Sequence, residues 1–212
     1  MMLFYAIVRW IVAGGSRVLY RAKIRGRENM PKSGGYVLAS SHRSMMDIPF
    51  AAYLTTSRLR YMGKASLFKI PVLGWLFTVL GGFEVQRDGT DRKALRESIA
   101  MLQNGEPLLV YPEGTRQHGP KIEPLQPGAA YLALRAGVPI VPVGIAGTEE
   151  IFRSHGTHIP HFGPVVVVIG EPLYPRERDG SAVPRAEVDA LTAQLHEALQ
   201  ELFDEANARR NG

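Results

Sequence analysis

Short apolar runs alternate along this chain with longer segments whose apolar residues recur every three or four positions. The run Val165–Ile169 is continuous and β-branched, which is typical of a strand buried on both faces. In the segment Pro184–Ala208, Val188, Leu191 and Leu195 fall on one helical face, and Leu199 and Leu202 continue it. This alternation predicts an α/β fold with a mixed, largely parallel sheet flanked by helices.

The remaining elements follow from the same patterns, in a chain of 212 residues that is long enough for one core-forming domain. Strands are expected at Tyr36–Ser40, Leu59–Met62, Phe83–Gln86, Leu108–Tyr111, Ile140–Ile145 and Val165–Ile169. Helices are expected at Asp47–Thr56, Pro71–Leu80, Asp91–Gln103, Pro127–Ala136 and Pro184–Ala208. Pro139 and Pro142 border or interrupt the fifth strand, so that strand is predicted to lie at an edge or to end at a bulge.

The amino-acid composition excludes several classes of site and indicates the charge of the partner. Cysteine is absent, which excludes disulfides, zinc-thiolate sites and cysteine nucleophiles. The net charge is +5, yet 12 of the 25 Lys and Arg and only 2 of the 20 Asp and Glu lie in residues 1–70. This basic N-terminal segment predicts an anionic partner, although a charge distribution that serves only solubility has the same pattern. Nucleic acid is not the expected partner, because no aromatic-and-basic RNA signature or DNA-reading helix is found.

Residues 1–23 are predicted to form an amphipathic helix at a membrane interface, with residues 24–212 as the main domain. Arg9, Ser16, Arg17 and Arg21 share one side of this helix. The other side carries apolar residues, namely Leu3, Phe4, Ile7, Val8, Trp10, Ile11 and Val18. Arg9 and Arg17 make the apolar stretch too short to span a bilayer. No basic region precedes it, so a cleaved signal peptide is not expected. The alternative is a helix that packs on the protein's own core.

The first candidate site lies where the strand Tyr36–Ser40 leads into a helix, which is where open α/β sheets bind ligands. His42 falls in the connecting loop and Asp47 in the first helical turn. The carboxylate can fold back onto one imidazole nitrogen and leave the other nitrogen free as a general base. A His–Asp pair that only caps the helix has the same spacing, so this motif alone leaves both interpretations open.

The second candidate site is Tyr111-Pro-Glu-Gly-Thr-Arg116, at the end of another predicted strand. Arg116 offers a planar fork suited to phosphate, and Gly114 permits a close backbone approach. Thr115 can donate its hydroxyl, while Glu113 could orient the arginine or accept a hydrogen bond from a ligand hydroxyl. A turn with a surface ion pair is the alternative.

Further blocks complete an ordered set that resembles the glycerophospholipid acyltransferase family, and within it the 1-acylglycerol-3-phosphate (lysophosphatidic acid) acyltransferases. The matching segments are Ser41-His42…Asp47, Gly63–Pro71 with Lys64, Phe83–Arg87, Tyr111–Arg116 and Val138–Pro142. Ser41 stands where the family usually has Asn, and Tyr111 where it usually has Phe. The interior of the block ending in Arg87 departs most from the family pattern.

The resemblance implies that His42, oriented by Asp47, deprotonates an acceptor hydroxyl that attacks an acyl thioester directly. Arg116 and Lys64 would hold the acceptor phosphate, and Arg87 is assigned to the acceptor more loosely. The other substrate-binding residues implied are Glu113, Gly114 and Thr115, the first supporting the pocket and the others shaping it. The donor would be acyl-CoA or acyl carrier protein, the acceptor lysophosphatidic acid and the product phosphatidic acid. No metal, cofactor or prosthetic group is implied.

The family's members act at the cytoplasmic face of the cell membrane, so peripheral or monotopic attachment to an anionic membrane surface is expected. Two alternatives stay open. The acceptor could be another lysolipid, because no block reports on its headgroup. A non-catalytic peripheral membrane-binding protein would keep the basic amphipathic helix, but it would have no use for His42 and Asp47.

Overall fold

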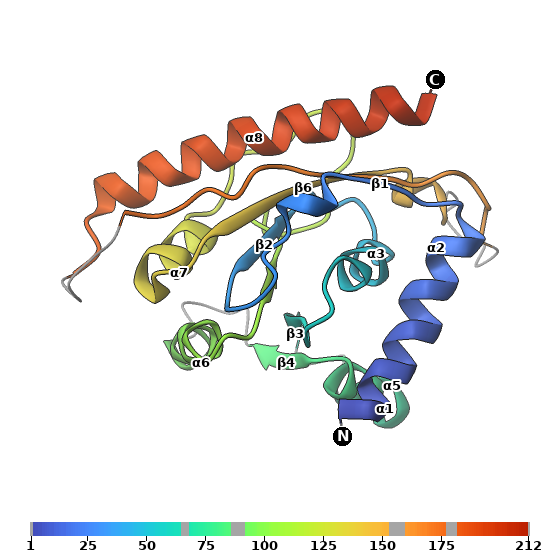
Figure 1. Ribbon diagram of the computed structural model, residues 1–212, viewed down its shortest axis with the longest axis horizontal. Coiled ribbons are helices and arrows are strands. Elements are labelled where there is room, and N and C mark those ends of the chain that lie inside the picture. The colour runs from blue at the N-terminus through green and yellow to red at the C-terminus, as the bar shows by residue number, and fades with distance from the viewer. Residues whose placement is uncertain (1, 65–67, 86–91, 153–159, 177–181, 212) are drawn as a thin grey trace.

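The computed structural model describes residues 2–64, 68–85, 92–152, 160–176 and 182–211. These residues form one seven-stranded sheet with helices on both faces (Figure 1). The strand order is β1-β7-β6-β2-β5-β3-β4, and all neighbours are parallel except β6 and β7. The mixed, largely parallel α/β sheet predicted from the alternating patterns is therefore confirmed.

The strands are β1 (Lys23–Arg25), β2 (Val37–Ser40), β3 (Arg60–Lys64), β4 (Gly82–Val85), β5 (Leu108–Val110), β6 (Ile140–Ala146) and β7 (Val166–Ile169). The α-helices are α1 (Met2–Arg9), α2 (Gly15–Leu19), α3 (Asp47–Leu54), α5 (Pro71–Val79), α6 (Arg92–Gln103), α7 (Gly128–Ala136) and α8 (Arg185–Asn211). A π-helix, η1 (Trp10–Gly14), joins α1 to α2, and the 3₁₀ turns are η2 (Arg27–Asn29) and η3 (Thr148–Glu150). Strand β1 was not predicted, because three residues with exposed ends carry no strand pattern.

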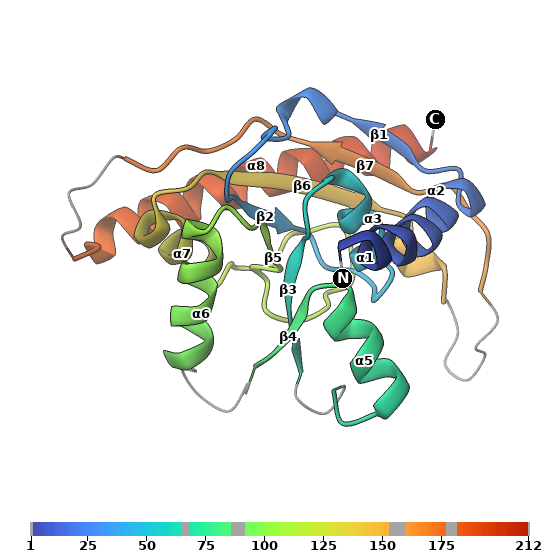
Figure 2. The same cartoon turned by 60° about the horizontal axis from the view of Figure 1, so that its bottom comes forward.

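The sheet separates two apolar cores, because successive side chains of a strand point to opposite faces. In β2, Val37 and Ala39 pack in the core under α6, α7 and α8. Leu38 belongs to the opposite core, together with Phe50 of α3. Figure 1 shows α8 lying along one face of the sheet. Figure 2 brings β3 and β4 forward, with α6 on one side and α5 on the other.

Helix α8 docks through one stripe of side chains, as its apolar spacing predicts. The buried members are Val188, Leu191, Leu195, Leu199, Phe203 and Ala206. Leu202, predicted as part of this face, is only partly buried against the same core. Through this stripe the helix packs on β6, β7 and α7.

The prediction that the strand with Pro139 and Pro142 lies at an edge is wrong, because β6 lies inside the sheet between β7 and β2. A bulge does occur beside β6, but on the neighbouring segment and not at the end of β6. Ile140 bridges Leu173 and Val143 pairs with Ile169, so one extra residue lies on the β7 side between these pairs. The Pro142 carbonyl accepts a hydrogen bond from the Gly170 amide on this side. The missing amide hydrogen of Pro142 therefore faces the bulge, where no regular ladder bond is required.

The N-terminal helix docks on α3 through its more polar side. The Tyr5 hydroxyl donates to the Ser57 carbonyl and accepts from the Leu59 amide. Nη1 of Arg9 donates to the Thr55 carbonyl at 2.6 Å and to the Ala52 carbonyl at 3.2 Å. Arg9 thus binds the end of α3, which corrects the expectation that it flanks an outward apolar face. In the described residues no helix is both long and apolar enough to cross a membrane.

Candidate active site

Two loops meet at the carboxyl edge of the sheet and build the candidate site. The loop after β2 carries His42, and the loop after β5 carries Tyr111 to Arg116. Because β2 and β5 are parallel neighbours, both loops leave the sheet at the same edge. The Gln117 amide donates to the His42 carbonyl at 2.9 Å, which ties the two loops together.

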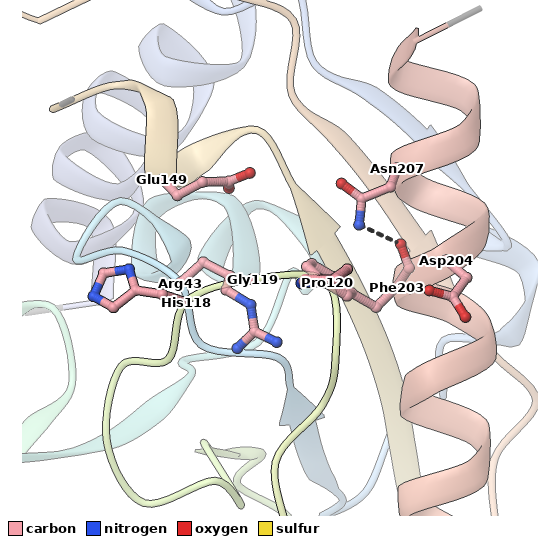
Figure 3. Close-up of a pocket in the computed structure, with 8 residues that line it drawn as sticks. All are labelled: Arg43, His118, Gly119, Pro120, Glu149, Phe203, Asp204 and Asn207. Atoms are coloured by element: carbon pink, nitrogen blue, oxygen red, sulfur yellow. Dashed lines mark hydrogen bonds between the residues drawn. The ribbon is translucent and has the colours of Figure 1, made fainter.

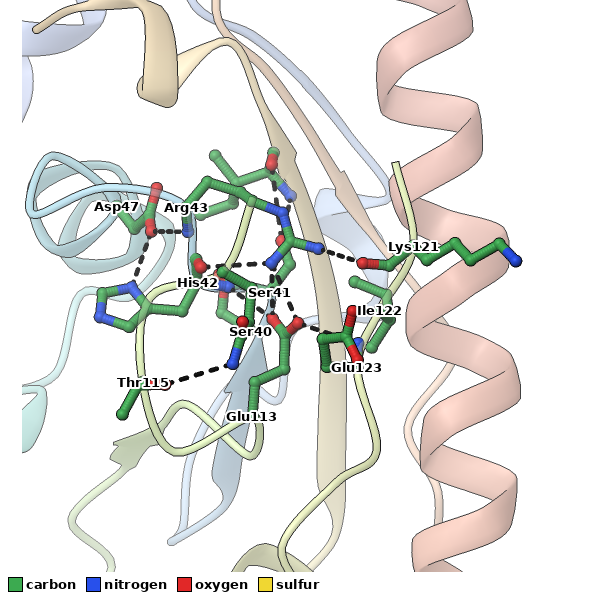
Figure 4. A network of polar contacts seen from close by, with 12 residues as sticks. Ser40, Ser41, His42, Arg43, Asp47, Glu113, Thr115, Lys121, Ile122 and Glu123 are labelled. Carbon is green, nitrogen blue, oxygen red and sulfur yellow. Dashed lines mark hydrogen bonds and ion pairs between the residues drawn. The ribbon is translucent and has the colours of Figure 1, made fainter. Parts of the chain in front are cut away.

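The Asp47 carboxylate is fully buried and collects four donors. Its Oδ2 lies 2.9 Å from Nδ1 of His42 and accepts from the backbone amides of Arg43 and Ser44, each at 2.8 Å. Its Oδ1 accepts from the Thr148 hydroxyl at 2.5 Å. Figure 4 shows Asp47 between the His42 ring and the Arg43 backbone. The predicted His–Asp pair is thus formed, and the carboxylate also closes the turn ahead of α3.

The contact with Asp47 sets the tautomer of His42. An ionised carboxylate only accepts hydrogen bonds, so Nδ1 carries the proton and Nε2 has its lone pair free. The His42 side chain is 15% exposed, whereas that of Asp47 is 0% exposed. Tyr111 stacks on the imidazole, with ring centroids 3.8 Å apart and 16° between the planes. The geometry therefore leaves one nitrogen as a proton acceptor at the edge of a pocket.

A buried ion pair supports the histidine loop from behind. Nη1 of Arg43 lies 2.9 Å and 3.0 Å from the two carboxylate oxygens of Glu113, and both side chains are essentially inaccessible. Oε1 of Glu113 also accepts from the His42 amide at 3.0 Å. Nη2 of Arg43 donates to the Lys121 carbonyl, as Figure 4 shows. Glu113 therefore braces the backbone of His42, and its ion-pair partner is Arg43, not Arg116 as the sequence analysis considered.

His42 opens on a pocket of about 620 Å³. The polar wall includes Gly114, Thr115 and Arg116, all three of them exposed. Ile48, Met62 and Phe77 are among the apolar lining residues. A positive φ of 78° at Gly114 turns the chain there, a conformation that costs glycine least. One pocket thus combines a proton acceptor, a guanidinium and an apolar wall.

Of the predicted substrate-binding residues, Gly114, Thr115 and Arg116 line this pocket together with His42. The other three do not line it among the described side chains. Glu113 lies behind the loop, as described above. Lys64 ends β3 opposite Val85, but its side chain lies outside the described residues. Arg87 also lies outside them. Tyr111 and His118 line the pocket without having been predicted to bind substrate.

A second cavity, of about 240 Å³, lies between the Arg43 side chain and α8 (Figure 3). Its lining includes His118, which also borders the larger pocket, and Glu149, Phe203 and Asn207. The Arg43 guanidinium sits over the Phe203 ring, 4.5 Å from its centroid. Among the residues described, no cluster of three or more His, Asp or Glu could hold a metal ion.

Sequence reasoning missed the partners that hold the two catalytic candidates. Arg43 follows His42 directly, but nothing in the sequence pairs it with Glu113, 70 residues away. Thr148 is 101 residues from Asp47. No sequence pattern indicates this contact, because it depends on β6 lying beside β2, which brings Thr148 to the carboxyl edge of the sheet near Asp47.

Comparisons with known proteins identify the family of this chain. The family model described as Acyltransferase matches residues 21–146. A chloroplastic 1-acyl-sn-glycerol-3-phosphate acyltransferase, BAT2 of Brassica napus, is 31% identical over 163 residues, covering 76% of this chain and 47% of that protein. The chain thus spans about half the length of the chloroplastic relatives it matches. The Bacillus subtilis enzyme of the same name is 29% identical, covering 85% of this chain and 87% of its own.

A solved structure matches as well. The crystal structure of the 1-acyl-sn-glycerophosphate (LPA) acyltransferase PlsC from Thermotoga maritima superposes with a TM-score of 0.75 at 27% identity. The match covers 98% of this chain and 87% of that one. Since the family model covers more than half of the sequence, the chain belongs to the acyltransferase family, and the relatives described here are named 1-acyl-sn-glycerol-3-phosphate acyltransferases.

Proposed function

We propose that this protein transfers a fatty acyl group from an acyl thioester to the free hydroxyl of 1-acylglycerol-3-phosphate, giving phosphatidic acid. The observation that carries the proposal is the 2.9 Å contact between His42 and Asp47 at the edge of a pocket that also holds Arg116. The names of the family relatives support the acceptor. Either acyl-CoA or acyl carrier protein serves as the donor.

The chemistry follows from the free Nε2 of His42. This nitrogen removes the proton of the acceptor hydroxyl while the hydroxyl oxygen attacks the thioester carbonyl carbon. A carbon–oxygen bond forms, the carbon–sulfur bond breaks, and the proton passes from the imidazolium to the departing thiolate. Asp47 keeps Nδ1 protonated and stabilises the imidazolium between these two steps. No metal or other cofactor is needed for this transfer.

The acceptor phosphate is held by Arg116, with Lys64 and Arg87 as further cations. Arg116 is exposed at the pocket wall, where its guanidinium can make paired hydrogen bonds to phosphate oxygens. Gly114 and Thr115 shape the same wall. Glu113 supports the pocket indirectly, because its carboxylate holds the backbone of His42.

The protein works at a membrane, attached peripherally from the cytoplasmic side. Residues 1–23 serve as the membrane-associating segment and residues 24–212 as the acyltransferase domain. Apolar side chains on the outer side of the N-terminal helix support this, since Trp10 is 69% and Val18 77% exposed. Lys23 and Arg25 are exposed on β1 and can meet anionic headgroups.

The test is product formation with defined substrates. Purified protein is mixed with lysophosphatidate and either acyl-CoA or acyl carrier protein, and phosphatidic acid is followed by mass spectrometry. His42→Ala should lower turnover by about 10²–10⁴-fold, the usual contribution of a general base. Asp47→Asn should lower turnover by a similar factor. Full turnover in a folded His42→Ala protein would overturn the mechanism.

The same assay decides between acceptors. A panel of lysolipids with different headgroups is offered with one donor. A preference for another lysolipid would keep the acyltransferase assignment and change the acceptor. Liposome binding without any acyl transfer would instead identify a membrane-binding protein.

A further inference from the structure

We infer that Thr148 is a positioning residue for acyl transfer, which holds the Asp47 carboxylate in the orientation that His42 requires. The inference rests on the proposed function. Thr148 is fully buried and its hydroxyl donates to Oδ1 of Asp47 at 2.5 Å. It therefore acts on the carboxylate from the side opposite to the imidazole.

The two carboxylate oxygens of Asp47 have different partners. Oδ2 faces His42 and the amides of Arg43 and Ser44, so its three donors come from the histidine loop itself. The Oδ1 contact comes from a different part of the chain. Rotation about the last torsion of an aspartate is soft, so donors at both oxygens restrict the rotation of the carboxylate plane. Thr148 thereby fixes the carboxylate plane relative to the imidazole.

Thr148 is itself held by a frame that does not include the histidine loop. It opens η3, which only Gly147 separates from β6, and Ile151 at the end of this turn is buried. Gly147 turns the chain with a φ of 97°, and a Cβ there would lie 2.5 Å from the Pro164 carbonyl oxygen. Arg210 of α8 pairs with Glu150 of the same turn. The donor is thus fixed to the sheet and α8 while it contacts a residue of α3.

The hydroxyl also sets how much negative charge is left to interact with His42. A charge-assisted hydrogen bond spreads part of the carboxylate charge onto its donor. Without the Thr148 donor, more charge stays on Asp47 and the imidazolium form of His42 becomes more stable. Because a protonated His42 cannot act as a base, the acidic limb of the rate profile should move to higher pH.

The primary test compares Thr148→Val with Thr148→Ser. Valine keeps the shape of threonine without a donor, whereas serine keeps the hydroxyl. Thr148→Val should lower kcat roughly 10–100-fold, the loss expected for one hydrogen bond to a charged group. The KM values for both substrates should stay unchanged, because the buried Thr148 does not line the pocket. The acidic limb of the rate profile of Thr148→Val should shift to higher pH. Thr148→Ser should restore both kcat and the position of this limb.

Thr192→Val is the matched control, because the Thr192 hydroxyl bonds only to the Val188 carbonyl of its own helix in the described structure. It removes a comparable hydroxyl, and it should leave kcat and the pH profile as they are. A mutation that merely loosened the fold would lower the active fraction equally at every pH. A valine effect that disappears in a His42→Ala background would show that both residues act as one unit.

The outcomes separate the inference from the function on which it rests. If His42→Ala keeps its activity, the proposed mechanism fails. If His42→Ala is inactive while Thr148→Val has wild-type kcat and an unshifted pH profile, the positioning role is overturned. Should the valine variant not fold, Thr148→Cys replaces it, because a thiol is a weaker donor of similar size. The cysteine variant should then fall measurably below Thr148→Ser in kcat, and equality of the two would overturn the role.

Discussion

Tyr111 lies flat against the His42 imidazole, with ring centroids 3.8 Å apart and planes inclined by only 16°. Asp47 holds the same imidazole by its edge, at Nδ1. The face of the ring is therefore fixed by the loop after β5, and its edge by the first residue of α3. In the proposed mechanism the stack would stabilise the imidazolium of His42, because an aromatic face favours a cation.

The Tyr111 hydroxyl contributes nothing visible to this arrangement. It is buried and has no hydrogen-bond partner among the described residues. Burial raises the pKa of Tyr111 well above its usual value of 10, so the phenol stays neutral in the working pH range. The ring, not the hydroxyl, contacts His42.

Replacing Tyr111 by phenylalanine should therefore keep turnover within about twofold, since the stack is retained. Tyr111→Leu removes the stack and should lower kcat roughly 3–10-fold, in line with the energy of an aromatic pair. Steady-state kinetics of the two variants make the comparison. An equal loss in both would assign a role to the hydroxyl and contradict this interpretation.

The Arg43–Glu113 pair should matter for stability more than any exposed pair. Glu113→Gln leaves a buried guanidinium without its counter-charge and should lower the free energy of unfolding by about 3–5 kcal/mol. Urea denaturation followed by circular dichroism measures the change. The matched control is Glu106→Gln, because the Arg60–Glu106 pair is partly exposed, and it should cost less than about 1 kcal/mol. Similar losses in both variants would show that burial of the pair is not decisive.

Much of the fold could be predicted because each element carries its own local pattern. Strand β7 is a run of β-branched residues, and α8 repeats apolar residues at helical spacing. The candidate base and its carboxylate are five residues apart, so a loop followed by a helical turn is enough to bring them together. The pocket residues from Gly114 to Arg116 follow a predicted strand in the same way.

The supporting contacts could not be predicted, because they join segments whose proximity depends on strand order. Thr148 reaches Asp47 only because β6 lies beside β2, and a periodic pattern does not reveal which strands are neighbours. Pro142 is tolerated inside the sheet because the segment beside it carries a bulge. Arg9 was expected to face outward as a charge, but it satisfies carbonyls at the end of α3 that would otherwise lack partners.

Acceptor binding should depend on the shape of the Arg116 side chain as well as on its charge. Arg116→Ala should raise KM for lysophosphatidate at least about tenfold and leave KM for the acyl donor nearly unchanged. Arg116→Lys should restore only part of the loss, because an ammonium group cannot make paired hydrogen bonds to phosphate. Arg135→Ala, at an exposed position on α7, serves as the control. Normal use of lysophosphatidate by Arg116→Ala would place the phosphate elsewhere.

The free energy of unfolding should fall at alkaline pH, because the buried tyrosines ionise more readily in the unfolded chain. Burial raises the pKa of Tyr36 to about 12 and also raises that of Tyr61, above the value of 10 expected in the unfolded chain. A group whose pKa is raised by folding stabilises the protein fully below pH 10, and this contribution is lost as the pH rises toward 12. Urea midpoints measured from pH 9 to pH 12 should therefore decline. Tyr36→Phe should flatten that decline, and an unchanged slope would contradict the assignment.

Membrane binding should depend on the outward apolar side of the N-terminal helix. Deleting residues 1–22 would be a poor test, because Tyr5 and Tyr20 are buried and their loss would damage the core.

Trp10→Ser combined with Ile11→Ser changes only side chains that are 69% and 68% exposed, and should weaken co-sedimentation with anionic liposomes at least about tenfold. Tyr174→Ser is the control, because Tyr174 is equally exposed but lies far along the chain, beyond β7. High salt should weaken binding of the unaltered protein without abolishing it, since salt screens the contribution of Lys23 and Arg25 but not that of apolar burial. If the double variant sediments as the unaltered protein does, the exposed side of this helix is not the membrane-binding surface.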